Sequence, residues 1–254
     1  MESKMEKSTP TISARSSAEP TSRQKRKKKI LKYVRYGALA FAVILLIAHF
    51  IWNASGSNQW ELVKDENGVK VWNLKTPGSN LVRVKATVRV KSRMAGMVKL
   101  LEDLESCVDA YCYDTKVIQQ IPSLPGRSAT YVRFKFDIPG LKTREYVLFA
   151  EHYQDTGSKI LEINVISAPN KLPRDECCVR VTHLHNNWKL TPLKNNEIDI
   201  EFMQDTDLGG LPYFFSNIAL TEGTYEVMHD MQNLMNKERY RNARVDYIQE
   251  LREH

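Results

Sequence analysis

The chain has 254 residues, of which 42% are apolar and 26% are charged, so it can bury one substantial core and is not disordered throughout. Its net charge of +7 is unevenly placed, because residues 1–56 hold 11 Lys/Arg and 3 Asp/Glu, whereas the rest of the chain holds 26 and 27. A body without a basic excess is a poor ligand for phosphate backbones, which are bound through many Lys and Arg side chains. Composition therefore excludes a nucleic-acid-binding function.

The N-terminal segment combines a polar tail with an apolar stretch. Residues 1–22 are rich in Ser, Thr, Pro, Glu and Lys, and a dense basic run extends from Arg23 to Arg35. Such a composition buries too little apolar surface to fold, so we expect residues 1–35 to form a disordered basic tail. Residues 36–52 follow, with His49 as their one strongly polar member. A helix of this length reaches roughly 26 Å, just enough to cross a bilayer, and predicts a transmembrane anchor over 36–52.

Charge placement predicts the orientation of this anchor. Eight positive charges lie between Arg23 and Arg35, and no Lys or Arg follows the apolar stretch until Lys64. The positive-inside rule then predicts a single-pass membrane protein with a cytoplasmic N-terminus and an extracytoplasmic body, which is periplasmic in a bacterial envelope. A cleaved signal peptide is the alternative, because Ala54 and Gly56 form a small-x-small site. The long apolar stretch and long leading segment favour a retained signal-anchor.

The body alternates between strand and helix patterns. Two strands are predicted at Val69–Lys75 and Leu81–Val90, joined by a turn at 77–80, and a helix is predicted from Ser92 to about Tyr111 behind a Ser cap. Further strands are expected over 116–121, 130–138, 146–153, 160–167, 178–193 and 197–206. A long helix closes the body. Antiparallel strands followed by one long helix indicate an α+β fold.

The closing helix carries one apolar face. At 100° per residue, one arc gathers a set of mostly apolar side chains that we expect to lie on the sheet. This arc contains Tyr213, Asn217, Leu220, Thr224, Val227, Met228, Met231, Leu234 and Met235. The arc leaves out Phe214, Phe215, Ile218 and Tyr225, so these residues need another partner. Beyond the helix, residues 238–254 form an amphipathic C-terminal extension suited to a partner or to the protein's own surface.

Six short segments in chain order resemble those of the START (steroidogenic acute regulatory protein-related lipid transfer) domains. They are Trp60-Glu61-Leu62 with Gly68-Val69-Lys70-Val71-Trp72, Arg144-Glu145-Tyr146-Val147, Pro173 with Val179-Arg180, Trp188 ahead of Pro192, Asp207-Leu208-Gly209-Gly210-Leu211-Pro212, and Asn217. The resemblance spans residues 58–237. It implies a helix-grip fold, in which a curved antiparallel sheet and the last helix enclose a tunnel for one hydrophobic ligand, with no cofactor.

Period-2 faces of the strands supply candidate walls for this tunnel. Together with the closing helix they give the predicted lipid-binding residues Val132, Phe134, Phe136, Tyr146, Leu148, Ala150, Ile163, Asn217, Leu220, Thr224, Val227 and Met231. Leu161 and Val165 share the face of Ile163. The alternative is that these stripes form a dry core.

Polar recognition inside the tunnel needs its own residues. Sterol-binding members of the family place an acid and a base on two tunnel strands, and the matching positions here, near Tyr131 or Val132 and at Ala150, are uncharged. We therefore assign polar recognition to Asn217, Thr224 and Tyr146, and leave phospholipid, sterol and other apolar ligands open.

The resemblance further implies a lid made of the last helix and the loop 138–142. A set of apolar residues in this region is predicted to contact a membrane. The set is Ile138, Leu141, Phe214, Phe215 and Ile218. The alternative is that the helix residues pack under the loop.

Catalytic and metal chemistry are not indicated. No nucleophile elbow, phosphate loop or dinucleotide motif is present, and His183 and His185 lack a third ligand. The four cysteines lack CxxC spacing, and we expect mostly buried free thiols, with a Cys107–Cys112 bridge as an alternative. We therefore predict a non-enzymatic lipid carrier. A helix-grip enzyme of the cyclase or hydrolase kind and a lipid sensor are alternative uses of the same cavity.

Overall fold

The computed structural model describes residues 22–107 and 112–251. By contacts, the chain divides into two compact units, one that ends at Ile51 and one that begins at Trp52. Residues 1–21 of the predicted basic tail lie outside the described residues.

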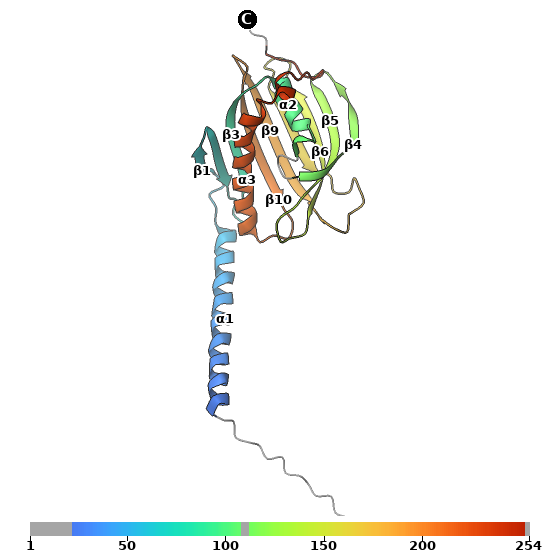
Figure 1. Cartoon of the computed structure of the whole chain (residues 1–254). Helices are drawn as coiled ribbons and strands as arrows, with labels where there is room; N and C mark the ends of the chain where they lie inside the picture. The colour runs from blue at the N-terminus through green and yellow to red at the C-terminus, as the bar shows by residue number, and fades with distance from the viewer. Residues whose placement is uncertain (1–21, 108–111, 252–254) are drawn as a thin grey trace, which may run out of the picture. The chain divides into compact units, whose positions relative to one another are not determined.

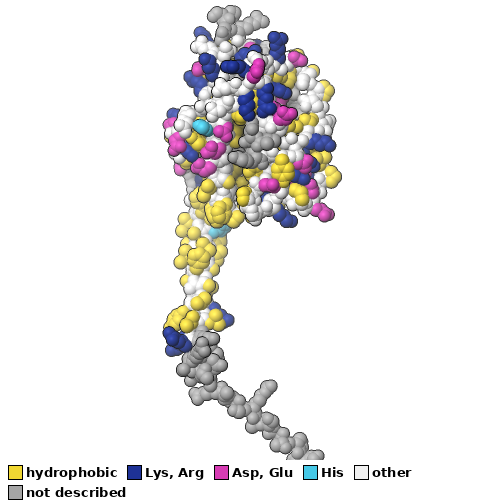
Figure 2. All heavy atoms as spheres, viewed as in Figure 1, with side chains coloured by type: hydrophobic (Ala, Val, Ile, Leu, Met, Phe, Trp, Pro, Cys, Tyr) yellow, Lys and Arg dark blue, Asp and Glu magenta, His cyan; other side chains and the backbone are white. Residues whose placement is uncertain are grey.

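The first unit is built on α1 (Ser22–Ala54), a continuous helix of 33 residues. Its segment Lys29–Ala54 is long and apolar enough, by length and composition, to cross a membrane, with a mean hydropathy of 2.0. Figure 2 shows hydrophobic side chains along most of this helix and basic side chains near its N-terminal end. The helix begins before the predicted span because the preceding Lys and Arg residues are themselves good helix formers.

The second unit is an antiparallel sheet with one long helix on it (Figure 1). Its helices are α2 (Met94–Glu102), α3 (Tyr213–Leu234) and α4 (Glu238–Arg241). Its strands are β1 (Trp60–Glu66), β2 (Val69–Leu74), β3 (Arg83–Lys91), β4 (Cys112–Leu124), β5 (Arg127–Phe136), β6 (Arg144–Gln154), β7 (Leu161–Ser167), β8 (Val179–Arg180), β9 (His183–Leu193) and β10 (Glu197–Asp207).

The strand order is β1-β2-β3-β10-β9-β7-β6-β5-β4, and β8 pairs with β6. After β3 the chain crosses to the far edge at β4 and then returns strand by strand, so β10 closes against β3. The predicted strand 178–193 is interrupted, because β8 leaves the antiparallel order and pairs in parallel with the start of β6. The α+β class and the helix-grip arrangement are confirmed.

Strand β1 is absent from the sequence-based prediction. It pairs with β2 through a tight turn in which Asn67 and Gly68 both have positive φ, at 51° and 77°. Such a turn favours Asn-Gly and matches the twist of a hairpin. Most of the β1 side chains are exposed, so the strand has no apolar alternation to reveal it.

The helix predicted over 92–111 is shorter in the structure. It ends at Glu102, where Asp103 takes an extended conformation with φ −76° and ψ 102°. No side chain caps the N-terminus from Ser92 or Arg93. Instead, the Glu250 carboxylate accepts the backbone N–H groups of Met94 and Ala95, each at 2.9 Å. This contact ties the C-terminal extension to α2.

Helix α3 packs mainly on β2 and β3 and covers the main core. Its buried residues are Ser216, Leu220, Thr221, Thr224, Tyr225, Met228 and Met231. The buried face of α3 is thus rotated relative to the predicted apolar arc, because β2 and Lys64 of β1 also contact the helix. Tyr225 is buried there, and its hydroxyl oxygen accepts a hydrogen bond from Asn67 at 2.7 Å.

Candidate functional site

The predicted tunnel walls on β5, β6 and β7 face the same side of the sheet. Register places Val132 opposite Leu148 and Phe134 opposite Tyr146, with the latter two rings stacked at 4.7 Å. Tyr146 and Leu148 belong to a second apolar cluster, distinct from the main core under α3. Half-buried Val132, Phe134, Phe136 and Val165 pack against it. Since α3 packs mainly on β2 and β3, this part of the inner face carries apolar side chains that protein atoms only partly cover.

The remaining candidates for the tunnel walls divide into three groups. Leu220, Met231 and Ile163 are packed in the main core, and Ala150 is half-buried opposite Val165. Val227 is 38% exposed and lies outside the buried face of α3, contrary to our expectation. The residue opposite Ala150 on β5 is Thr130. The positions at which sterol-binding members carry an acid and a base are therefore uncharged here, as the sequence indicated.

Of the three predicted polar residues, Asn217 has a structural role. Its side-chain oxygen accepts the backbone N–H of Val82, and its amide donates to the carbonyl of Asn80, both at 3.1 Å. These bonds fix the start of α3 to the loop before β3. Both side-chain polar atoms of Asn217 are hydrogen-bonded within the protein, so Asn217 is a weaker candidate for ligand recognition than the sequence suggested.

Tyr146 differs, because its hydroxyl has no hydrogen-bond partner among the described residues. The side chain is 8% exposed, and burial raises its pKa to about 12, so it stays a neutral phenol. Ser216, in the first turns of α3, is 1% exposed, and its hydroxyl likewise lacks a partner among the described residues. A buried polar atom without a partner costs free energy, so the Ser216 hydroxyl is suited to a polar atom of a bound molecule. The Tyr146 hydroxyl is a second polar group without a partner in the described part of the chain.

Further polar side chains lie on the inner face where β10 ends, and sequence analysis missed them. Gln204 donates to the hydroxyl of Thr224 and to the carbonyl of Leu220, and buried Thr206 donates to Asn186 at 3.3 Å. A signal was present, because Gln204 and Thr206 continue the alternation of Ile198, Ile200 and Phe202. The inner face therefore changes from apolar to neutral polar along this strand.

A clamp of buried charges holds the loop ahead of α3. Arg144 donates to the carbonyls of Leu208 and Gly209, at 3.0 and 2.9 Å. Beside it, Glu145 and Arg180 form an ion pair at 2.8 Å, and both side chains are 2% exposed. Three of the START-like segments, which contain Arg144, Arg180 and Leu208, are thus in contact, and the charged side chains hold them together. These charged side chains bond to each other and to backbone carbonyls.

A second titratable cluster joins α2, β6 and the C-terminal extension. The Tyr247 hydroxyl donates to Glu102, and His152 Nδ1 lies 3.1 Å from the same hydroxyl. Burial lowers the pKa of His152 to about 4 and raises the pKa of the Glu102 carboxyl. Burial and the Glu102 hydrogen bond raise the pKa of Tyr247 as well. At neutral pH the imidazole is therefore uncharged, and the cluster fastens the extension to the body.

The predicted membrane-contact residues are apolar and largely exposed. Exposed fractions are 50% for Leu141, 50% for Phe214, 58% for Phe215 and 62% for Ile218, whereas Ile138 is half-buried. The alternative that these helix residues pack under the loop does not fit such exposure. The Phe214 and Phe215 rings contact each other at 4.3 Å between centroids.

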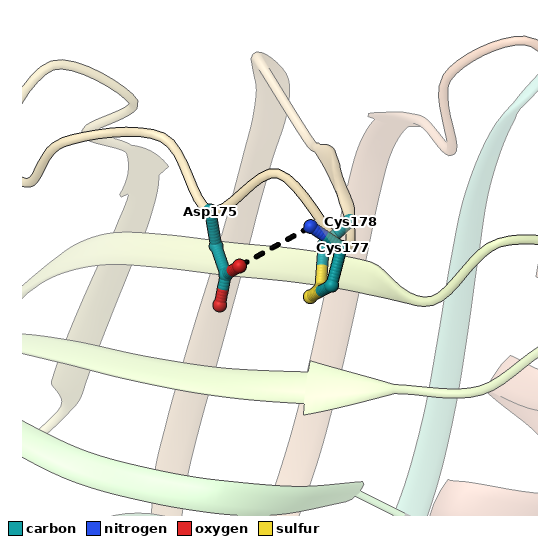
Figure 3. Close-up of side chains that lie close together, drawn as sticks. All are labelled: Asp175, Cys177 and Cys178. Atoms are coloured by element: carbon teal, nitrogen blue, oxygen red, sulfur yellow. Dashed lines mark hydrogen bonds between the residues drawn. A yellow bond between two sulfur atoms is a disulfide. The ribbon is translucent and has the colours of Figure 1, made fainter.

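The prediction of free thiols is wrong. Cys107 pairs with Cys112, and Cys177 pairs with its neighbour Cys178, so no cysteine is free (Figure 3 shows the second pair beside Asp175). The Cys107–Cys112 bridge is possible because α2 ends at Glu102, so Cys107 and Cys112 do not share a helix. Their Cα atoms lie 5.2 Å apart.

A surface hollow lies on the opposite, solvated face of the sheet. Its charged lining includes Lys70, Arg89, Asp199 and Glu201. Arg89 and Asp199 form an exposed ion pair at 2.6 Å. Asp199 and Glu201 are therefore solvated strand residues.

Comparisons with known proteins bear on this architecture. No protein-family model matches the chain. An uncharacterized protein of Pseudomonas aeruginosa is 23% identical over 204 residues, which cover 79% of this chain and 98% of that protein. A solved fragment of a STAR-related lipid transfer protein from Xanthomonas axonopodis superposes with a TM-score of 0.62 at 20% identity, over 70% of this chain and 99% of the fragment.

Two human structures give the same result. StAR-related lipid transfer protein 5 matches with a TM-score of 0.59 and 16% identity, over 78% of this chain and 95% of that one. The lipid transfer and protein localization domain of StarD13 matches with a TM-score of 0.61 and 12% identity, over 76% and 96%. The body of the chain therefore has the START helix-grip fold that its sequence segments implied, and an apolar helix precedes it.

Proposed function

We propose that this protein holds one lipid-like molecule between the inner face of β5–β7 and α3, and transfers it without catalysing a reaction. The observation that carries the proposal is the half-buried apolar face of Val132, Phe134 and Phe136, set within a fold shared with lipid transfer proteins. Ligand pockets are mostly apolar with a few placed polar groups, and the hydroxyls of Tyr146 and Ser216 fit that description.

The interior favours a ligand with a neutral polar end. A charged group inside an apolar cavity needs a charged partner. The buried charges Arg144, Glu145 and Arg180 are already engaged with carbonyls or with one another. Two unpartnered hydroxyls suit a hydroxyl, ester or ether group. Phospholipids remain candidates if their phosphate stays at the rim of the pocket.

Membrane attachment forms part of the proposal. We infer that residues 1–35 are a cytoplasmic tail, that 36–52 cross the membrane once, that 58–237 bind the ligand and that 238–254 are an extension fastened to the body. Two disulfides support an oxidising, extracytoplasmic location for the body, which is periplasmic in a bacterium.

Contacts at Trp52 support a retained anchor over a cleaved signal peptide. Its indole donates to the carbonyl of Asn80 at 2.9 Å and stacks on Tyr213, with 6.0 Å between centroids. Lys75 donates to the carbonyl of Ser55 at 3.0 Å. Cleavage after Gly56 would remove Trp52 and Ser55 from the folded unit that they help to build.

The exposed apolar residues Leu141, Phe214, Phe215 and Ile218, together with half-buried Ile138, are proposed to enter the surface of a bilayer during loading. An apolar patch of this kind usually marks an interaction site. The loop 138–142 and α3 then act as the lid through which the ligand passes.

The decisive experiment measures bound lipid. The full chain is extracted from membranes without added lipid, denatured, and analysed for lipid by mass spectrometry. We expect about one lipid per chain, and we expect Ala150→Trp, which fills the inner face, to remove most of it. The neighbouring Glu151→Trp changes the outer face and should retain the lipid. Folded Ala150→Trp with undiminished lipid would contradict the proposed location of the ligand, and a lipid-free wild type would contradict the function.

A further inference from the structure

The loop that joins β7 to β8 carries a side-chain cluster that the lipid-binding proposal does not use. Asp175, Cys177 and Cys178 lie together on this loop, as Figure 3 shows. Buried Arg180 donates to the carbonyls of Pro169 and Pro173, at 2.6 and 2.8 Å. These contacts hold the loop without the help of the disulfide.

The Cys177–Cys178 bond is poorly suited to a structural role. Disulfide stabilisation grows with the number of residues in the closed loop, and these two cysteines are neighbours. Their Cα atoms lie 3.7 Å apart, the spacing that the peptide bond between neighbours imposes, so the bridge ties together no distant parts of the chain. Cys177 is exposed, so a reductant can reach it. We infer that the bond can be opened while the loop keeps its place.

Asp175 completes a set of three ligands. One carboxylate oxygen and the two sulfur atoms lie within 4.8 Å of one another. The backbone N–H of Cys177 donates to Asp175 Oδ1 at 3.2 Å, which holds the carboxylate beside the sulfurs. Two thiolates and a carboxylate are a donor set that Zn²⁺ accepts in proteins, with a fourth position left to water.

Charge at the cluster fits a divalent cation. Two thiolates and one carboxylate carry one more negative charge than a divalent ion neutralises. The Lys135 ammonium lies 2.9 Å from Asp175 Oδ2 and supplies the balancing charge. In protein metal sites a ligating carboxylate is typically hydrogen-bonded by a further residue that does not bind the metal, as Lys135 does here.

We propose that Asp175, Cys177 and Cys178 form a redox-gated site for a thiophilic divalent cation of the zinc class. In the oxidised form the S–S bond occupies both sulfurs and the site is closed. A dithiol reductant supplies two electrons and two protons, breaks the S–S bond and becomes a disulfide itself. The cation then binds and releases the two thiol protons. This site is independent of the proposed lipid function.

The test uses the full chain in detergent and Co²⁺ as the probe. Cys107→Ala/Cys112→Ala removes the other two cysteines, and a water-soluble phosphine reduces the remaining pair. We expect one Co²⁺ per chain with a sulfur-to-cobalt charge-transfer band after reduction, no band before it, and loss of the band when Zn²⁺ is added. If that background does not fold, wild type is compared directly with Cys177→Ser/Cys178→Ser.

Matched variants separate this site from adventitious binding. Cys177→Ser/Cys178→Ser should abolish the band, and Asp175→Asn should weaken Co²⁺ binding at least about tenfold. Asp155→Asn is the control, because Asp155 also accepts a backbone N–H in an exposed loop. A reduced chain without the band, a band that survives loss of both cysteines, or a band in the unreduced chain would each overturn the proposal.

Discussion

At the scale of single residues, the buried ion pair of Glu145 and Arg180 has the largest consequence for stability. Removing one partner leaves the other charge buried and uncompensated, which costs about 3–5 kcal/mol. We predict that Glu145→Gln lowers the free energy of unfolding by an amount in this range, although the Arg180 guanidinium keeps its carbonyl partners. The measurement is urea unfolding of the full chain in detergent, followed by tryptophan fluorescence.

An exposed pair supplies the control for this prediction. Arg89 and Asp199 are bidentate, but their side chains are 58% and 46% exposed. Exposed pairs contribute little, so Asp199→Asn should cost less than about 1 kcal/mol. Equal losses of unfolding free energy for Glu145→Gln and Asp199→Asn would show that burial does not make the first ion pair more important for stability.

His152 predicts a loss of stability in weak acid. Its folded pKa is about 4, whereas its ordinary value is 6.5, so between these values the unfolded chain binds the proton and the folded chain does not. Stability is therefore complete above pH 6.5 and falls as the pH drops toward 4, by up to about 3 kcal/mol. Glu102, whose pKa is raised, works in the opposite direction, because its folded form binds a proton more readily than the unfolded chain.

Substitution isolates the histidine contribution. In His152→Gln, unfolding measured from pH 7.5 to 4.5 should lose the part of the slope that His152 supplies, while the Glu102 contribution remains. His183→Gln serves as control, because the His183 side chain is 58% exposed and lies beside Asp205. An unchanged slope in His152→Gln would remove His152 as the source of acid sensitivity.

At the scale of elements, the loop 138–142 and the start of α3 predict a membrane-dependent step. Leu141→Asp places a charge in the exposed apolar patch, so we expect it to slow lipid transfer between vesicles several-fold and leave stability within about 0.5 kcal/mol. Leu124→Asp is the matched control, because Leu124 is 64% exposed at the other end of the β4–β5 hairpin. Equal transfer rates for the two variants would exclude the patch from loading.

The elements also show what the sequence could predict. Strands with alternating apolar residues, such as β3 and β10, were found within a few residues of their ends. Strand β1 was missed, because its exposed side chains give no alternation, and this omission carried over to α3, where Tyr225 is buried against a neighbour that was not foreseen. Just after the end of α2, Asp103 accepts a hydrogen bond from the Tyr240 hydroxyl at 2.9 Å, a long-range contact that local propensity does not encode.

The candidate site was predictable to a similar degree. Alternation of apolar residues identified the inner face of β5 and β6, because residues two positions apart in a strand lie on the same face of the sheet. The role of Asn217 could not be read from the chain, since its partners Asn80 and Val82 lie far away in sequence. The Cys107–Cys112 bridge was only an alternative to free thiols in the sequence-based prediction, because the distance between these two residues depends on where α2 ends.

At the scale of the whole molecule, cysteine chemistry and charge make the same prediction about location. Disulfides form and persist outside the reducing cytoplasm, and both pairs lie in the unit that follows the apolar helix. Basic residues precede that helix, which favours a cytoplasmic N-terminus. The proposed anchored carrier would work within reach of its own membrane, so the proposal predicts transfer across a short gap between two membranes.

Reporter fusions test this orientation directly. Alkaline phosphatase fused after residue 254 should be active in bacterial cells, because it folds only outside the cytoplasm, and green fluorescent protein at the same position should be dark. Replacing the basic residues between Arg23 and Arg35 by Gln removes the charge asymmetry, so phosphatase activity should fall as some chains insert in reverse. The control changes Lys4, Lys7 and Arg15 instead, which lie farther from the span and should have a smaller effect. In the unaltered chain, an inactive phosphatase fusion together with a fluorescing green fluorescent protein fusion would place the body in the cytoplasm. That result would contradict the oxidised cysteine pairs.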